Sequence, residues 1–351
     1  MENEKNIINE TATSNNKTME YINNVTKSMI NQTTTDTDNE SSLEHEAYIL
    51  AKKAENKLKR RCCLYGLCVS KNERYIDACD LYRKAGDKFK ICNQWKKAGL
   101  CYENSALIKV KMKESPVNFY RQSYSCFAKI DIGDDSKRIF NELNKSLEKE
   151  GEYFQIAKNN ENLAIKKEKK KKLDEAINYY LQAIKYYEKD EKHEHLKIKI
   201  EIKLAELMMM HEHPDSPEKV PKMLENIGTN YLKKIITKYA AKDYFGKAIL
   251  SSLYYSNNPS EGRKYIHKIN KIDKSFAESS IHTLCIDIIK SMENNDINSM
   301  KKAIEKYKEF CEIDEFLAYI LAQIVEKMEI NCNLKESTFE ENNNDEDNSI
   351  K

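Results

Sequence analysis

Residues 95–102 read Trp-Lys-Lys-Ala-Gly-Leu-Cys-Tyr, in which a small pair lies midway between two large residues. The template recurs along the chain at Tyr75, Ala78-Cys79 and Tyr82, at Ser136, Ile139-Phe140 and Leu143, at Leu173, Ala176-Ile177 and Tyr180, and at Met300, Ala303-Ile304 and Tyr307. At helical periodicity these positions share one face. The template therefore predicts packed helices in which large residues of one helix rest on small residues of its neighbour.

This arrangement is typical of the first helix of a tetratricopeptide-like unit. The copies at 95, 136 and 173 are about 40 residues apart rather than the usual 34 or so, so we expect longer helices. Stacked hairpins of this kind curve into a superhelix with a concave and a convex face. The predicted fold class is all-α: a tetratricopeptide-like superhelix of antiparallel helical hairpins, capped by a C-terminal helical bundle.

The composition supports an all-helical chain. Only 8 glycines and 5 prolines occur in 351 residues, which is too few to supply the turns of a β-rich fold. Hydrophobic residues make up 40 % and charged residues 33 %. This balance favours an elongated array with a thin core.

The chain divides into four segments by composition. Residues 1–42 are rich in Asn and Thr and are predicted to be disordered, because they have few bulky apolar residues to bury. Residues 43–221 hold the repeats, and three of the five prolines lie within 211–221. Residues 222–335 are expected to form the closing bundle, with a helix over 276–292 and a last buried helix over 313–330. Residues 336–351 are predicted to be an acidic, flexible tail.

Charge is unevenly distributed along the chain. Residues 1–40 hold seven acids and three bases, and residues 336–351 hold six acids and one base. Since the whole chain carries +2, the body over 41–335 carries +11. Such a chain can bind an acidic partner and a basic partner at different ends. The alternative is that lysine-rich runs such as 166–172 are solvated helix faces.

An apolar stretch follows the basic run 57–61. Connecting segments normally lie on the surface, where polar residues are expected. An apolar segment beside cations suits shallow insertion into an anionic bilayer surface, and its cysteines could accept palmitate. The predicted membrane-attachment residues, all within 62–69, are Cys62, Cys63, Leu64, Tyr65, Leu67, Cys68 and Val69. The alternative is that this stretch packs beneath the first helical hairpin.

Sequence signatures of catalysis and metal binding are missing. The ten cysteines form no CxxC pair, and we interpret them as buried free thiols, for example at Cys79, Cys101 and Cys311. There is no glycine-rich phosphate loop, Gly-x-Ser-x-Gly or HExxH, so we expect no catalytic residues, no metal and no cofactor. No apolar run approaches the ~20 residues of a membrane span. We expect a cytoplasmic protein that binds no nucleic acid and is monomeric when free.

The sequence resembles the alpha-type soluble NSF attachment proteins (alpha-SNAPs). Residues 239–248, Tyr-Ala-Ala-Lys-Asp-Tyr-Phe-Gly-Lys-Ala, are similar to the family segment K-Y-S-A-K-D-Y-F-F-K-A. Residues 225–230, Glu-Asn-Ile-Gly-Thr-Asn, are similar to E-Q-V-G-T-N. The resemblance is collinear from about 43 to 335, and it places the apolar stretch 62–69 at the family's membrane-attachment position.

The resemblance implies an adaptor between two partners. It implies a basic concave face that binds an assembled, acidic SNARE four-helix bundle, and an acidic C-terminal end that recruits and stimulates the hexameric ATPase NSF. The SNARE-facing residues that it implies are Lys90, Lys129, Lys158, Lys199, Lys203 and Lys242. The NSF-facing residues that it implies are Glu293, Asp345, Glu346, Asp347 and Ile350.

The chain departs from the family pattern at a few positions. Glu152 and Ser280 replace basic residues of the family, and Asn348-Ser349 intervene before Ile350. The resemblance also implies peripheral attachment to membranes of the Golgi, the endoplasmic reticulum and vesicles, in vesicle-mediated protein transport. The alternative function is a generic tetratricopeptide-type scaffold or co-chaperone that binds peptide tails. An enzyme is the least favoured class.

Overall fold

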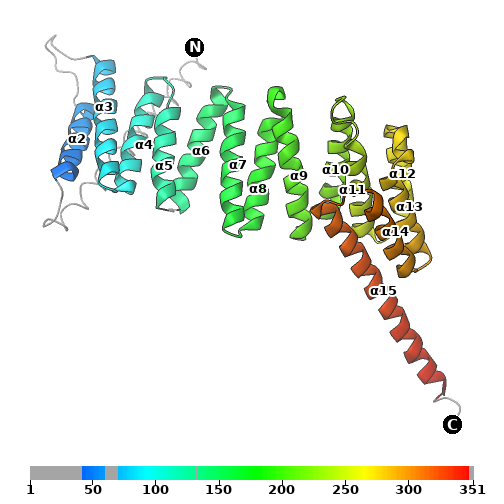
Figure 1. Ribbon diagram of the computed structural model, residues 1–351. Helices are drawn as coiled ribbons and strands as arrows, with labels where there is room; N and C mark the ends of the chain where they lie inside the picture. Colours follow the sequence, from blue (N-terminus) through cyan, green and yellow to red (C-terminus); the bar gives the residue numbers. More distant parts are fainter. Residues whose placement is uncertain (1–41, 60–69, 131–132, 348–351) are drawn as a thin grey trace, which may run out of the picture. The chain divides into compact units, whose positions relative to one another are not determined.

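A computed structural model describes residues 42–59, 70–130 and 133–347, with side chains as far as Asn331 except that of Glu191. Residue contacts divide the chain into two compact units: unit 1 ends at Ile156, and unit 2 begins at Ala157. Over the described residues, the regular elements are helices, as predicted (Figure 1). The predicted boundary between repeats and bundle at 221–222 falls inside unit 2 and stays a prediction.

Unit 1 is built from successive helices, each packed against the next. They are α2 (Ser42–Lys59), α3 (Lys71–Ile91), α4 (Trp95–Lys111), α5 (Val117–Lys129) and α6 (Gly133–Lys149). The first described residue of the segment 70–130 caps α3: the Ser70 hydroxyl accepts a hydrogen bond from the Glu73 amide at 3.1 Å, and the Glu73 carboxylate accepts one from the Ser70 amide at 2.9 Å. This capping box fixes the start of α3 without a buried contact. The extra length of the repeat lies in its helices, as expected, since α3 has 21 residues and α4 has 17.

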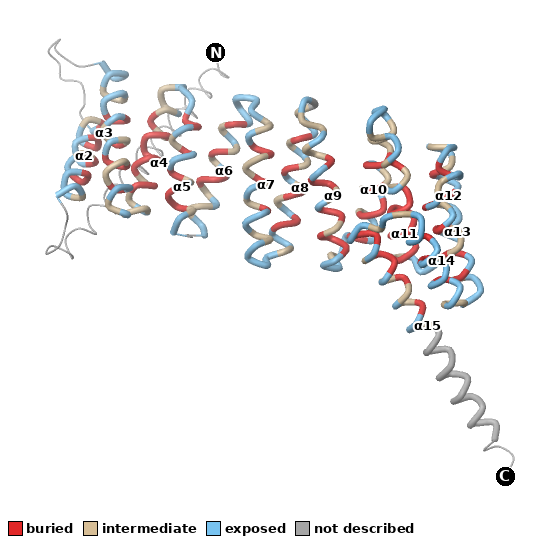
Figure 2. The backbone as a smooth tube through the Cα atoms, viewed as in Figure 1, coloured by how far each residue is buried: buried red, intermediate tan, exposed pale blue. Residues whose placement is uncertain are grey.

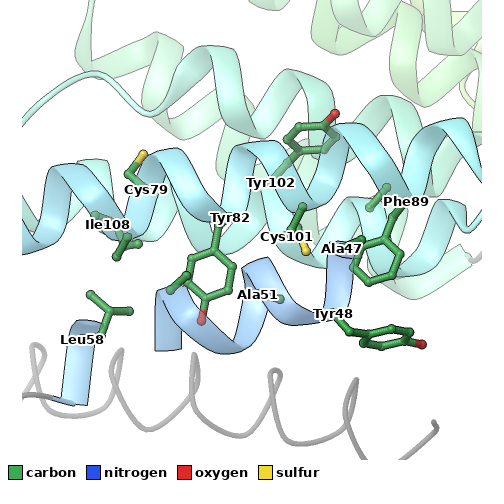
Figure 3. Close-up of a cluster of buried hydrophobic side chains, with 14 of the residues drawn as sticks. Ala47, Tyr48, Ala51, Leu58, Cys79, Tyr82, Phe89, Cys101, Tyr102 and Ile108 are labelled. Carbon is green, nitrogen blue, oxygen red and sulfur yellow. The ribbon is translucent and has the colours of Figure 1, made fainter. Parts of the chain in front are cut away.

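The core of unit 1 forms at the template positions (Figure 3). Ala78, Tyr82, Ala98 and Tyr102 are buried, as the sequence predicts. The small positions let neighbouring helices approach closely: a Cβ atom at Gly99 of α4 would lie 2.9 Å from the ring of Phe127 on α5. Glycine is therefore required at that crossing rather than merely tolerated. The buried residues lie along the inward faces of the helices, while exposed residues cover the outward faces (Figure 2).

Unit 2 begins with antiparallel helices and changes its packing after α10. The array helices are α7 (Tyr153–Lys169), α8 (Leu173–Tyr187), α9 (Glu194–Met210) and α10 (Ser216–Leu232), with a short 3₁₀ helix η2 (Glu191–His193) before α9. The remaining helices are α11 (Ala241–Ser256), α12 (Pro259–Ile272), the 3₁₀ helix η3 (Lys274–Glu278), α13 (Ser280–Glu293), α14 (Ile297–Phe310) and α15 (Glu315–Asp347). Helix α11 packs against α10, α12, α13 and α15, so it forms the centre of a helical bundle.

Three local expectations differ from the structure. The helix predicted over 276–292 is divided, because the Ser279 hydroxyl accepts the His282 amide and starts α13 there. Cys311 is half-buried rather than fully buried, because α14 ends at Phe310 and Cys311 follows as its C-cap. Helix α15 continues to Asp347, past the predicted end at 330, and its sequence contains no glycine or proline that would stop it. Cys79 and Cys101 are buried free thiols, as expected.

Candidate functional site: lysines on alternate helices

Unit 1 brings two of the predicted SNARE-facing lysines to one edge. Lys90 lies in the last turn of α3, Lys129 is the last residue of α5, and both are exposed. The Lys129 ammonium lies 4.4 Å from the centroid of the Trp95 ring at the start of α4, within cation–π range. Burial raises the pKa of the Cys126 thiol to about 11, and both lysines act in the opposite direction. The two positive charges are therefore neighbours around one buried thiol.

In unit 2, two of the predicted lysines are held by carboxylates of α7. Lys158 Nζ lies 2.9 Å from Glu161 Oε2, and Lys203 Nζ on α9 lies 3.0 Å from Glu168 Oε1. Two tyrosines of α8 position these carboxylates. The Tyr187 hydroxyl donates a hydrogen bond to Glu161 and the Tyr180 hydroxyl donates one to Glu168, each at 2.9 Å. These lysines are oriented by their partners, and part of their charge is already compensated.

Lys199 and Lys242 differ from that pair. Lys199 is exposed on α9 and Lys242 is half-buried on α11, and neither forms an ion pair with any residue whose side chain the structure describes. Lys199 and Lys203 are four residues apart, so they share one face of α9. Lys199 and Lys242 are thus the predicted cations of unit 2 that remain uncompensated.

All six predicted lysines lie on alternate helices. In unit 1 they are on α3 and α5, and in unit 2 on α7, α9 and α11. Consecutive helices of a hairpin array alternate between two layers, so alternate helices of one unit share a layer. Within the array, α3 and α5 of unit 1 therefore share a layer, as do α7 and α9 of unit 2, while Lys242 lies on the next alternate helix, α11, at the centre of the bundle.

An exposed apolar pair precedes Lys242 in the chain, in the connection that leads into α11. The connection between α10 and α11 holds Ile235 and Ile236, which are 83 % and 94 % exposed, followed by Tyr239 at 73 %. Lys238 Nζ lies 4.9 Å from the centroid of the Tyr239 ring. The connection is ordered by Thr237, whose hydroxyl donates to the Tyr231 carbonyl at 3.0 Å. This patch was not predicted from the sequence, although two adjacent isoleucines between lysines are a visible signal.

A charged cluster joins this region to the last helix. The Lys247 side chain is buried on α11, forms an ion pair with Asp314 just before α15, and lies 5.1 Å from the centroid of the Tyr244 ring. On α9, burial raises the pKa of the Glu206 carboxyl, which Lys203 and Lys247 oppose. The helices that carry Lys203 and Lys242 are therefore tied electrostatically to the start of α15.

The predicted NSF-facing acids are only partly described. Glu293 ends α13 and is held by both ends of the Arg263 guanidinium, with Nε–Oε1 at 2.7 Å and Nη2–Oε2 at 2.5 Å. These hydrogen bonds lower the pKa of Glu293. Asp345, Glu346 and Asp347 lie in the last turn of α15, but their side chains are outside the described residues, as are Ile350 and the membrane-attachment residues of 62–69.

Over the described part of the chain, no cluster of three or more His, Cys, Asp or Glu side chains has the geometry of a metal site. None of the helices described is both long and apolar enough to span a bilayer. The described thiols that are fully buried are poor nucleophiles, because burial raises the pKa of Cys101 and Cys285 well above the usual range.

Comparison with known proteins decides the family. The family model described as soluble NSF attachment protein, SNAP, matches residues 45–329, which is most of the chain. The chain belongs to the soluble NSF attachment protein family. Human alpha-soluble NSF attachment protein is 24 % identical over 293 residues, covering 81 % of this chain and 95 % of that protein. The probable vesicular-fusion protein sec17 homolog of Neurospora crassa is 27 % identical over 287 residues, covering 80 % and 96 %.

The vesicular-fusion protein SEC17 of Komagataella phaffii is 27 % identical over 254 residues, covering 72 % of this chain and 84 % of that protein. The SNAP family model begins at residue 45, so the preceding Asn/Thr-rich residues lie outside the match. The match includes all six predicted lysines and Glu293, and it ends before the acidic C-terminal residues.

Proposed function

We propose that this chain is a non-enzymatic adaptor for SNARE-complex disassembly in vesicle fusion and intracellular protein transport. It binds an assembled SNARE bundle through the lysines on alternate helices, and its acidic C-terminal end recruits the NSF ATPase. In this proposal it works in the cytoplasm, is monomeric when free and attaches peripherally to membranes through residues 62–69. The observation that carries the proposal is that the predicted lysines lie on alternate helices in each unit.

The charge distribution supports separate surfaces for the two partners. The cationic helices of each unit attract an acidic four-helix bundle, while the C-terminal residues from 336 onwards carry six acids and one base and suit a basic partner. Opposite potentials on the two surfaces fix the orientation of the adaptor and favour fast, salt-sensitive assembly. Membrane attachment adds an effective-concentration gain that needs no further protein contact.

Removal of Ile350-Lys351 is expected to separate SNARE binding from ATPase coupling. The truncated chain should bind SNARE bundles normally, while NSF recruitment falls by about 10- to 100-fold, because a buried isoleucine contributes about 1.5–3 kcal/mol. The measurement is SNARE disassembly in liposomes with NSF and ATP, together with SNARE binding. The matched control replaces Asn348 and Ser349 by alanine and keeps both terminal residues.

Failure of the full chain to bind an assembled SNARE bundle at low salt would overturn the adaptor proposal and favour the scaffold alternative. Normal disassembly by the truncated chain would instead show that the terminal isoleucine is not the coupling element.

The exposed apolar pair extends the proposed SNARE-binding surface beyond the lysines. Replacing Ile235 and Ile236 by serine should weaken SNARE binding about tenfold or more, because apolar contact area is lost at the interface. Thermal stability should stay within about 0.5 kcal/mol, because both side chains are already exposed in the free protein. Ile330→Ser, at an exposed isoleucine of α15, is the control and should bind normally. Equal SNARE binding by the double variant and the control would show that Ile235 and Ile236 are not part of the SNARE-binding surface.

A further inference from the structure

A second group of lysines lies at the opposite edge of unit 1 from Lys90 and Lys129. This edge, which we call the α3–α4 edge, is where α2 and α4 end and where α3 and α5 begin. Lys71 is the first residue of α3, Lys111 is the last residue of α4, and Lys113 follows two residues later with a positive φ of 59°. Three cations therefore come together from two helix ends.

The charges at the α3–α4 edge are unevenly compensated. Lys57 and Lys109 have acidic partners, with Nζ–oxygen distances of 2.6 Å to Asp77 and 2.5 Å to Glu114. Lys71 and Lys113 are exposed and form no ion pair with the described residues. This edge thus carries two outward-facing positive charges that no described carboxylate balances.

Lys71 and Lys111 are close enough to repel each other. The pKa of Lys111 is lowered to about 8, mainly by burial and secondly by the charge of Lys71. The fold brings two ammonium groups together at a cost that an anion placed between them would relieve. A phosphate group is the natural ligand for such a cluster of lysines.

Two apolar side chains near the same helix ends are exposed. Ile76, in the second turn of α3, is 53 % exposed, and Val110, in the last turn of α4, is 46 % exposed. The Lys71 ammonium also lies 5.6 Å from the centroid of the Tyr75 ring. A surface that mixes cations with exposed apolar side chains suits the boundary between headgroups and acyl chains better than it suits a soluble anion.

The course of the chain indicates the same partner. Helix α2 ends at Lys59 and α3 is capped by Ser70, so the chain leaves and re-enters the α3–α4 edge on either side of residues 60–69. Those residues include two arginines and the apolar stretch assigned to membrane attachment, and they lie outside the described residues. The lysine cluster belongs to the ordered helices on either side of that stretch.

We propose that the α3–α4 edge binds anionic lipid headgroups through Lys71, Lys111 and Lys113, with Ile76 and Val110 facing the acyl boundary. This inference rests on the membrane attachment in the proposed function, and it names the lipid class that the attachment selects. It makes a bilayer with anionic lipids the preferred surface and places unit 1 on it by this edge. Lysines near an anionic leaflet each contribute to membrane affinity, and the contribution decays within a Debye length.

Vesicle flotation of the full chain tests the proposal. The two vesicle types are pure phosphatidylcholine and a phosphatidylcholine–phosphatidylserine mixture. The variant is Lys71→Glu/Lys113→Glu, which changes two exposed residues and leaves the half-buried Lys111 in place. The matched control is Lys96→Glu/Lys137→Glu, an equal charge change at exposed lysines near the starts of α4 and α6, on the opposite edge. A charge-preserving variant, Lys71→Arg/Lys113→Arg, completes the set.

The wild-type chain, the control and the arginine variant should float better on the anionic vesicles, and added salt should reduce this preference. The glutamate variant should lose at least about tenfold of its affinity for anionic vesicles, while its binding to neutral vesicles is unchanged. Equal losses in the variant and the control would overturn the site, as would equal flotation of the wild-type chain on both vesicle types. Solution binding to a SNARE bundle reports separately on the adaptor proposal, and it should be normal in the glutamate variant.

Discussion

Reversal of the two uncompensated lysines of unit 2, in the variant Lys199→Glu/Lys242→Glu, is expected to weaken binding to an assembled SNARE bundle by about 30-fold or more. One exposed ion pair contributes only about 0.2–1 kcal/mol, so a single truncation would change little. Reversal of both charges removes two attractions and places like charges opposite an acidic partner, which costs several kcal/mol. The measurement is SNARE-bundle affinity in solution at low and at moderate salt.

The choice of these two lysines follows from the ion pairs in unit 2. Lys158 and Lys203 already have carboxylate partners on α7, so reversing either would also disturb Glu161 or Glu168 and the tyrosines that donate to them. Lys199 and Lys242 have no such partner among the described side chains. Their reversal therefore changes the surface potential with the least disturbance to the fold.

The matched control is Lys185→Glu/Lys222→Glu. These exposed lysines lie on α8 and α10, the alternate helices that carry none of the predicted SNARE-facing residues. The net charge change is identical, so a non-specific electrostatic effect would weaken both variants equally. An equal loss of affinity in the control would contradict a SNARE-binding surface confined to the alternate helices α7, α9 and α11. A loss that does not diminish with added salt would contradict an electrostatic origin.

The sequence predicts the repeat core well because that core depends on local spacing. Tyr82, Tyr102 and Tyr180 are buried where the template places them, since the helical period alone puts them on the face that meets the neighbouring helix. The small residues between them are equally predictable, because a close helix crossing requires a small side chain. Helix ends are harder to predict, as at α15, where the apolar stripe weakens but nothing in the sequence stops the helix.

The charged site is less predictable than the core. The position of each lysine follows from the family resemblance, but which acid faces it depends on how helices align across a layer. Glu168, for example, meets a lysine 35 positions along the chain. The apolar pair at 235–236 was missed for a related reason, since isoleucines count towards a buried stripe unless the connection between two helices is known. Residue type alone does not separate a core isoleucine from an exposed one.

Phe245→Ala is expected to have the largest effect on stability, lowering the free energy of unfolding by about 3–5 kcal/mol. The side chain is fully buried in α11, and its ring lies 6.0 Å from that of Phe276 at an interplanar angle of 80°. A Cβ atom at Gly228 of α10 would lie only 2.7 Å from the Phe245 ring, so two helices close on this side chain. Neither the glycine nor the second ring can move in easily to fill the cavity. The measurement is urea-induced unfolding of the full chain, read as a lower midpoint.

Tyr239→Ala is the control, because it removes another large aromatic side chain from a neighbouring site that is mostly exposed. Its unfolding midpoint should stay close to that of the wild-type chain. The two variants then separate the roles of two aromatic residues: Phe245 anchors α11 in the bundle, while Tyr239 is exposed. If Phe245→Ala kept its unfolding midpoint, packing of Phe245 would not be what holds α11 in the bundle. The Lys247–Asp314 ion pair would then hold α11 in place, and with it Lys242.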